Sequence, residues 1–340
     1  MLQNLENMLS DCTLCPRDCH ADRLKGKTGY CGQTALPKAA RAALHYWEEP
    51  CISGAAGSGA VFFSGCQLRC AFCQNYDIAA GNAGREITTE RLAEIFLELQ
   101  EKGANNINLV TPTHFVPVIA AALETAKNRG LFIPIVYNTS SYEKVDTLKM
   151  LDGLVDIYLP DLKYVSSELS GCLSNARDYF DVARTAIAEM VRQVGEAVFS
   201  GPDGKEWNAR QMNAMCEEEC NADTDFLMKK GVIVRHLALP GQAADSRKVL
   251  KYLHKTYGDR IYISIMNQYT PMPRIKKWME GRCAAGVPEK LFAGLDRKLT
   301  NEAYEALINY AMELGVENGF LQEGDTAEKS FIPAFDGEGI

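Results

Sequence analysis

Short apolar runs alternate with helical apolar periods along most of this chain. Six runs are rich in Val, Ile and aromatic residues, and they lie at 60–63, 107–110, 133–137, 157–159, 232–239 and 261–266. Such runs are typical of strands that are buried on both faces of a parallel sheet. Apolar residues recur every three or four positions at 92–99, 119–126, 178–195, 246–258 and 304–314, which predicts helices between the strands. The alternation predicts an α/β fold of six βα units, a partial (β/α)6 TIM-like barrel.

Composition divides the chain into four parts. Residues 1–35 form a small cysteine-rich segment, 36–59 have the composition of a linker, 60–322 contain the βα units, and 323–340 form a C-terminal tail. The alternation is interrupted at about 197–231, which we interpret as an exposed insertion. Cys216 and Cys220 lie there at positions i and i+4, so a helix would place both on one face. Two thiols on one face leave open a metal site in the insertion.

Charge and hydropathy exclude some functions. A formal net charge of −8 argues against a nucleic-acid surface, and we interpret the densest basic cluster, Arg274-Ile275-Lys276-Lys277, as a solvated surface. The amino terminus lacks a signal-peptide pattern, and the apolar runs are too short to span a bilayer. We therefore predict a cytoplasmic protein that binds neither nucleic acid nor a membrane.

Cys66, Cys70 and Cys73 lie within eight residues, directly after the first predicted strand. Chemistry in parallel α/β folds belongs at the carboxyl ends of strands, which is where this loop begins. In a reducing compartment, clustered cysteines are typical of metal sites rather than of disulfides. Three thiolates can bind three irons of a cubane iron–sulfur cluster and leave one iron open for a small ligand. The alternatives are a zinc knuckle or three unrelated core thiols.

A second cysteine group lies near the amino terminus, with the spacing Cys-x2-Cys-x3-Cys-x11-Cys, at Cys12, Cys15, Cys19 and Cys31. This segment is too short to bury a core of its own, so it is predicted to bind a metal. A closed zinc site and a fully ligated iron–sulfur cluster both fit, and four free thiols are the alternative. The isolated thiols at Cys51, Cys172 and Cys283 are interpreted as free.

Polar residues follow the other predicted strands. They are Thr111-Pro112-Thr113-His114, Asn138-Thr139, Asp161-Leu162-Lys163, Arg235-His236 and Asn267-Gln268-Tyr269. A rim of this kind indicates a ligand with both charges and hydrogen-bonding groups. His114 by itself fits a packing role as well as a catalytic one. His45, Glu48 and Glu49, in the predicted linker, are interpreted as surface or packing residues, and a position lining a cleft is the alternative.

Taken together, these motifs resemble the radical S-adenosylmethionine (AdoMet) proteins related to pyruvate formate-lyase activating enzyme, in the branch with an N-terminal four-cysteine segment. The resemblance spans most of residues 12–322. It is carried by the Cys66–Cys73 loop, Cys15-Pro16-Arg17-Asp18-Cys19, Val110-Thr111-Pro112-Thr113-His114, Leu159-Pro160-Asp161-Leu162-Lys163, residues 189–195, residues 234–241 and Asn267-Gln268-Tyr269.

The resemblance implies that Cys66, Cys70 and Cys73 are the catalytic ligands of a [4Fe–4S] cluster and that AdoMet binds its open iron. It places Phe72 beside the adenine. Further AdoMet contacts are expected from Gln74, Asn75, Thr111, Thr113, Asn138, Thr139, Asp161, Lys163, Arg235 and Asn267.

At two places the sequence differs from the motifs of the families that it resembles. Thr111-Pro112-Thr113 stands where the superfamily has Gly-Gly-Glu, and Thr113 is expected to substitute for it. Asn138-Thr139 stands where activating enzymes have an Asp-Thr pair. That pair and the Asp-Leu-Lys motif, here Asp161-Leu162-Lys163, hold a monovalent cation. The asparagine removes one negative charge from this possible cation site.

The implied activity is reductive cleavage of AdoMet to a 5′-deoxyadenosyl radical, with flavodoxin or ferredoxin as the electron donor. In activating enzymes this radical takes a hydrogen from a glycine of a glycyl-radical protein. One alternative is the same chemistry on a free amino acid, a peptide or another small molecule. An alternative of another class is an iron–sulfur electron carrier or redox sensor.

Overall fold

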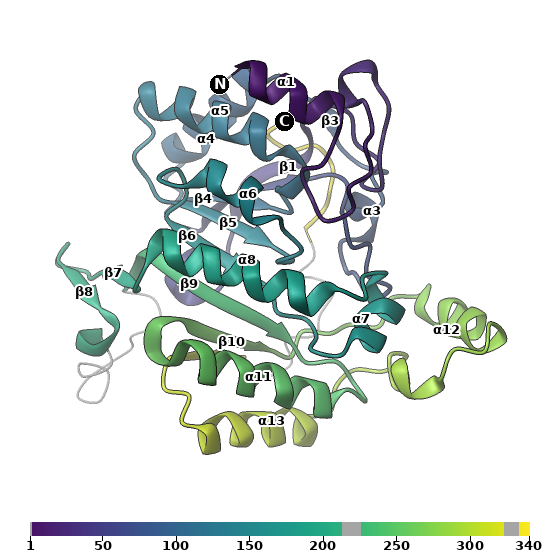
Figure 1. Ribbon diagram of the computed structural model, residues 1–340. Coiled ribbons are helices and arrows are strands. Elements are labelled where there is room, and N and C mark those ends of the chain that lie inside the picture. Colours follow the sequence, from purple (N-terminus) through teal and green to yellow (C-terminus); the bar gives the residue numbers. More distant parts are fainter. Residues whose placement is uncertain (1, 213–225, 323–332) are drawn as a thin grey trace.

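The computed structural model describes residues 2–212, 226–322 and 333–340. Its central feature is a parallel sheet whose strands follow the order of the chain (Figure 1). Neighbours in this sheet are β2 (Ser58–Phe63), β4 (Ile107–Val110), β5 (Ile135–Thr139), β6 (Ile157–Pro160), β9 (Leu227–Leu237) and β10 (Tyr262–Met266). All six predicted strands are thus present. The short strand β11 (Gly319–Leu321) adds a further parallel neighbour to β10. This sequential parallel order is consistent with a sector of a βα barrel.

Five long helices connect the strands and cover the sheet (Figure 1). They are α4 (Thr89–Glu101), α5 (Val116–Asn128), α8 (Tyr179–Val194), α11 (Ala243–Tyr257) and α13 (Asn301–Leu314). Each contains one of the predicted apolar periods. In α4 the periodic residues Leu92, Ile95, Phe96 and Leu99 are all buried, and the Thr88 hydroxyl caps the helix by accepting from the Arg91 amide.

The remaining helices are shorter. They are α1 (Leu2–Ser10), α2 (Pro50–Ser53), α3 (Tyr76–Ala79), α6 (Val145–Leu148), α7 (Ser167–Ser174) and α12 (Ile275–Ala284). Single 3₁₀ turns occur at Arg23–Lys25, Thr113–Phe115, Lys149–Leu151, Gly258–Arg260 and Glu289–Leu291. None of the described helices combines the length and the apolar character needed to cross a membrane.

Residues 36–59 differ from the predicted linker. They contain β1 (Lys38–His45), which pairs antiparallel with β2, and the short strand β3 (Arg85–Glu86) pairs with β1 in turn. The β1 sequence is rich in alanine, which has little intrinsic β preference, so composition gave no strand signal. The end of the chain also packs on β1, where the Ala42 amide donates to the Glu338 carbonyl at 2.8 Å.

The interruption at 197–231 contains a small antiparallel ribbon. Strands β7 (Val198–Ser200) and β8 (Glu206–Asn208) pair with each other, and β7 also pairs with the first part of β9. Figure 1 shows this ribbon at one end of the sheet. Cys216 and Cys220 lie outside the described residues.

Candidate functional site

A cavity of about 250 Å³ opens at the carboxyl ends of the parallel strands. It brings together most of the predicted site residues, which are Cys66, Cys70, Phe72, Cys73, Gln74, Asn75, Thr111, Asn138, Thr139, Asp161, Lys163 and Arg235. Thr113 and Asn267 are not among its lining residues. These strand ends converge because parallel strands joined by helices all end at the same edge of the sheet.

The cysteine loop is fastened at several points between β2 and α3. The Gly65 amide donates to the Ile78 carbonyl at 2.7 Å, and the Ala71 amide donates to the Leu173 carbonyl at 2.8 Å. Gln74 Nε2 reaches the Gln268 carbonyl at 2.5 Å. Arg274 Nη2 donates to the Cys73 carbonyl at 2.8 Å. The loop is therefore held from four different parts of the chain.

The three loop thiols share one electrostatic environment. Burial raises the pKa of the Cys70 thiol to about 11, and burial together with Cys70 and Cys66 raises that of Cys73 to about 12. The Ser174 hydroxyl donates to Cys70 Sγ at 3.0 Å. Such thiols ionise when a metal neutralises them, because the metal removes the cost of a buried negative charge.

This donor set fits a cubane cluster, in which each thiolate binds a different iron. Among the described residues, no three His, Cys, Asp or Glu side chains converge as ligands of a single metal ion. A zinc knuckle would need that convergence.

Asp161 and Lys163 form a half-buried ion pair on the cavity wall, with Lys163 Nζ 2.5 Å from Asp161 Oδ2. Burial alone would lower the pKa of Lys163, but the Asp161 carboxylate, with Cys70 and Tyr179 adding to its effect, raises this pKa. Lys163 therefore stays charged, and its ammonium occupies one side of the Asp161 carboxylate.

Arg235 is paired with two carboxylates that the sequence did not indicate. Its Nε and Nη2 donate to Glu49 at 2.9 and 2.7 Å, and Nη2 also contacts Glu48. All three side chains are buried: that of Arg235 is 11% exposed, that of Glu49 is 5% exposed and that of Glu48 is 8% exposed. Burial would raise the pKa of Glu48, but Arg235, together with His45 and Asn108, lowers this pKa overall. Glu48 and His45 also line the cavity.

Asn138 faces the same carboxylate. Its Nδ2 donates to Glu48 Oε1 at 3.3 Å, and Asn108 Nδ2 donates to that oxygen at 2.9 Å. Glu48, 90 residues earlier in the chain, thus places a carboxylate beside Asn138. A local sequence motif cannot reveal this contact, because the two residues lie in distant parts of the chain.

Thr113 lies behind the cavity wall rather than on it. It is fully buried, its hydroxyl donates to Glu143 Oε1 at 2.6 Å, and it accepts from Gln67 Nε2 at 2.8 Å. Glu143 also accepts from the Thr139 hydroxyl and from Tyr137 at 3.3 Å. Burial raises the pKa of Glu143 to about 7. The network joins the cysteine loop to the ends of β4 and β5.

Three other predicted residues occupy distinct positions. Thr111 lines the cavity with φ +58°, which is rare for a β-branched residue and marks a constrained strand end. The Asn267 amide donates to Gln322 Oε1 at 2.7 Å, outside the cavity lining. His114 is buried beneath the cysteine loop and its Nε2 donates to the Ser64 carbonyl at 2.7 Å, which is a packing position.

The N-terminal cysteines lie close to one another beside the cysteine loop. Cys12, Cys15 and Cys31 are buried, and Cys19 is half-buried. Burial raises the pKa of Cys15 to about 12, with Cys31 and Cys12 adding to the rise. The segment is joined to the cysteine loop by Arg17, whose Nε donates to the Gln67 carbonyl at 2.8 Å. Metal binding by these four thiols stays a prediction.

Residues 60–202 match the family model described as the Radical SAM superfamily. The chain is 24% identical over 322 residues to "Uncharacterized protein MJ0674" of Methanocaldococcus jannaschii, covering 92% of this chain and 77% of that protein.

Solved structures of Streptococcus suis SuiB resemble the chain more weakly. SuiB bound to its precursor peptide SuiA gives a TM-score of 0.43 at 11% identity, over 76% of this chain and 46% of that one. SuiB bound to S-adenosylmethionine gives a TM-score of 0.44 at 12% sequence identity. This match covers 76% of this chain and 48% of the SuiB chain. The chain thus spans about half the length of SuiB.

Proposed function

We propose that this protein is a radical AdoMet enzyme, with Cys66, Cys70 and Cys73 holding a [4Fe–4S] cluster and AdoMet bound in the adjoining cavity. One observation carries the proposal: three thiols line a cavity that is also lined by the polar residues at the ends of several strands. The match to the Radical SAM family model over residues 60–202 supports it. When bound, the cluster supplies the electron that splits the S–C5′ bond of AdoMet into methionine and a 5′-deoxyadenosyl radical.

The chain's own residues would position AdoMet. Phe72 packs edge-on against Tyr164 and Tyr269, with 6.4 Å between the ring centres in each pair. In this position it would give the adenine an apolar neighbour. Asn138, Thr139 and the Asp161–Lys163 pair offer polar partners for the amino-acid end of AdoMet. Because Lys163 already neutralises Asp161, the proposal includes no monovalent cation.

The hydrogen abstracted by the radical is proposed to come from a glycine of a glycyl-radical partner, on the strength of the sequence resemblance to activating enzymes. The second candidate is a free amino acid or another small polar molecule. The cavity favours that candidate, because Glu48, Asn138 and Arg235 give it a charged wall. In both cases a reducing, cytoplasmic setting is proposed, in keeping with ten described cysteines that form no disulfides.

Equilibrium binding of AdoMet to anaerobically reconstituted protein tests this proposal against the electron-carrier alternative. Saturable binding that requires the reconstituted cluster is expected, because an open iron and a polar cavity serve no purpose in a carrier. The acceptor is then identified by adding candidates to the cleavage reaction. A glycyl radical signal in electron paramagnetic resonance with a co-encoded partner identifies an activase, and substrate-dependent 5′-deoxyadenosine identifies a small molecule. Protein that contains the cluster and yet leaves AdoMet free in solution would contradict the proposal.

A further inference from the structure

A second cavity, of about 430 Å³, lies on the other side of the cysteine loop from the AdoMet cavity. Four cationic side chains line it: Arg69, Arg274, Lys277 and Arg282. None of its lining residues, all within the part of the chain that the structure describes, is acidic. Cys70 lines both cavities, so it forms part of the wall between them.

Aromatic rings and backbone carbonyls hold these cations in place. The Arg274 guanidinium lies 3.5 Å from the centre of the Tyr76 ring, and that of Arg282 lies 5.0 Å from the Trp278 ring. Arg282 Nη2 also reaches the Cys172 carbonyl at 3.4 Å. Within the described chain none of the four forms an ion pair, and the buried Nε atoms of Arg69 and Arg274 have no hydrogen-bond partner. Their positive charge is therefore available to a ligand.

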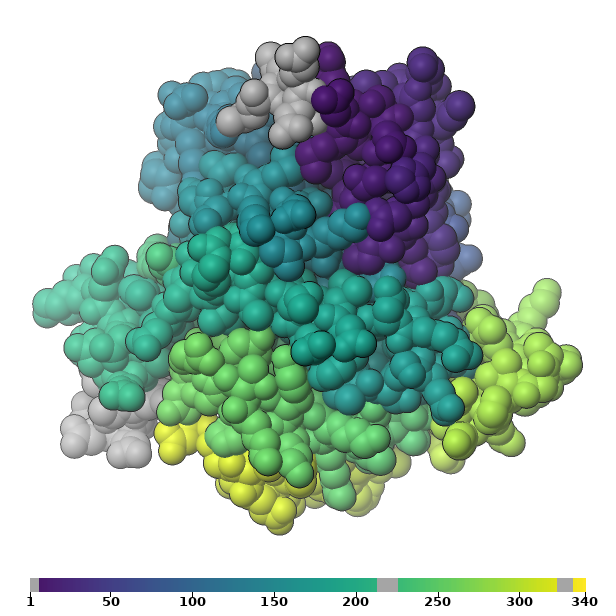
Figure 2. All heavy atoms as spheres, viewed as in Figure 1, coloured from purple at the N-terminus to yellow at the C-terminus, as the bar shows by residue number. Residues whose placement is uncertain are grey.

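This cavity extends the interpretation of the basic cluster at 274–277. Lys276 and Lys277 are exposed, as expected of a solvated surface, but Arg274 and Lys277 also line the cavity and Ile275 is buried. Helix α12, which carries Lys277 and Arg282, projects from the body of the molecule beside this cavity (Figures 1 and 2). A concentrated positive surface on a chain of net charge −8 is complementary to an acidic partner.

We propose that this surface, defined by Arg69, Arg274, Lys277 and Arg282, is the docking site of an acidic one-electron carrier protein. The inference rests on the proposed function, which consumes one electron per AdoMet cleaved. The reduced carrier donates one electron and dissociates in its one-electron-oxidised form. With a cluster held by Cys66, Cys70 and Cys73, this electron would cleave the S–C5′ bond of AdoMet to give methionine and the 5′-deoxyadenosyl radical. Because Cys70 lines both cavities, a carrier docked at the second cavity would lie next to a cluster ligand without entering the AdoMet cavity.

A protein fits this site better than a small anion does. The cations are spread over the wall and the projecting helix, and Lys277 is exposed, so they face a broad partner rather than one point. Electron-transfer partners typically form small, weak interfaces whose association is steered by complementary charge. Such binding weakens as salt screens the charges.

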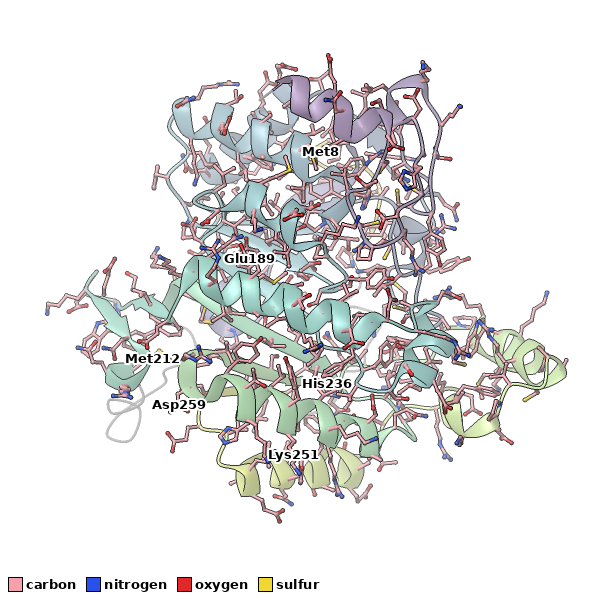
Figure 3. All side chains as sticks on the ribbon, viewed as in Figure 1. Met8, Glu189, Met212, His236, Lys251 and Asp259 are labelled. Atoms are coloured by element: carbon pink, nitrogen blue, oxygen red, sulfur yellow. The ribbon has the colours of Figure 1, made fainter. Side chains whose placement is uncertain are left out.

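Charge reversal on α12 tests the docking site. The variant Lys277→Glu/Arg282→Glu is compared with wild type for its affinity for reduced flavodoxin, a strongly acidic one-electron carrier, at low and high salt. We expect a loss of about tenfold or more at low salt, with a flatter salt dependence. The control is Lys251→Glu, an exposed lysine on α11 away from α12 (Figure 3), which should bind like wild type.

The chemical reductant dithionite separates this inference from the proposed function. With dithionite, the α12 variant should cleave AdoMet at the wild-type rate, because only docking is impaired. Unchanged flavodoxin affinity in the α12 variant, or an equal loss in Lys251→Glu, would overturn the docking site. Saturable inorganic phosphate binding that Lys277→Glu/Arg282→Glu abolishes, without effect on flavodoxin, would also overturn it in favour of a small-anion site. Wild type that fails to cleave AdoMet with dithionite would overturn the proposed function instead.

Discussion

At the scale of single residues, the site depends on buried carboxylates that no sequence motif marked. Glu48 and Glu49 neutralise Arg235, and Glu48 also accepts from Asn138. Removing one partner from such a group leaves a buried charge uncompensated, which is far more costly than the pair is stabilising. Asn138 therefore lies beside a buried charged cluster that includes Glu48 and Arg235.

Glu143 makes a testable residue-scale prediction. A glutamate in the unfolded chain ionises near pH 4.5, while burial raises the pKa of Glu143 in the folded protein to about 7. Between these values the unfolded chain releases a proton that the folded protein keeps, so this group's contribution to stability falls as pH rises. The loss is complete above pH 7 and amounts to about 3 kcal/mol.

Glu143→Gln removes this ionisation and keeps the shape. Urea unfolding at pH 4.5 and pH 8 should show the variant gaining stability relative to wild type as pH rises. Free energies of unfolding that change in parallel for the two proteins over this range would contradict a raised pKa at Glu143.

At the scale of elements, the N-terminal segment and the cysteine loop form one packed unit. A Cβ added at Gly65 would lie 2.7 Å from the Cys31 carbonyl and 2.6 Å from Gln33 Cγ. Arg17 stacks on Tyr30 and Tyr142 at 4.2 and 5.1 Å and donates to the Gln67 carbonyl. The four-cysteine segment thus packs against and stiffens the loop that carries Cys66, Cys70 and Cys73.

Gly65→Ala measures this contact against a matched control. Gly103 has a similar φ of +84° but nothing within 4 Å of an added Cβ, whereas Gly65 has φ +87° and the crowded contacts above. Gly103→Ala should cost about 1 kcal/mol, the strain of the left-handed backbone alone. Gly65→Ala should cost about 2 kcal/mol more, because the added carbon overpacks the interface. Equal losses in urea unfolding would mean that the segment does not press on the loop.

At the scale of the whole molecule, hydrophobic patterning predicted what depends on local sequence. The six predicted apolar runs correspond to β2, β4, β5, β6, β9 and β10. The five predicted helical periods correspond to α4, α5, α8, α11 and α13. The spacing of Cys66, Cys70 and Cys73 predicted a shared site because residues of one short loop must lie close together. The positions of Asp161 and Arg235 on the cavity wall could be predicted because parallel strands end at the same edge of the sheet.

What depends on distant partners could not be predicted. Strand β1 is alanine-rich and exists because it pairs with β2. The pairing of Glu49 with Arg235 joins residues 186 apart in the chain. The displacement of Thr113 from the cavity follows from hydrogen bonds to Gln67 and Glu143, two residues of other loops. Each of these features is created by packing rather than by a local pattern.

The most direct test of the central claim is reductive AdoMet cleavage by anaerobically reconstituted protein, with 5′-deoxyadenosine as the measured product and iron and zinc counted in each sample. The exposed thiol of Cys283 provides the control. Wild type and Cys283→Ala should cleave AdoMet with dithionite. Cys73→Ala should lose cleavage and cluster iron while keeping any metal held by the N-terminal cysteines. Cleavage retained by Cys73→Ala would contradict the assignment of the cluster to this loop.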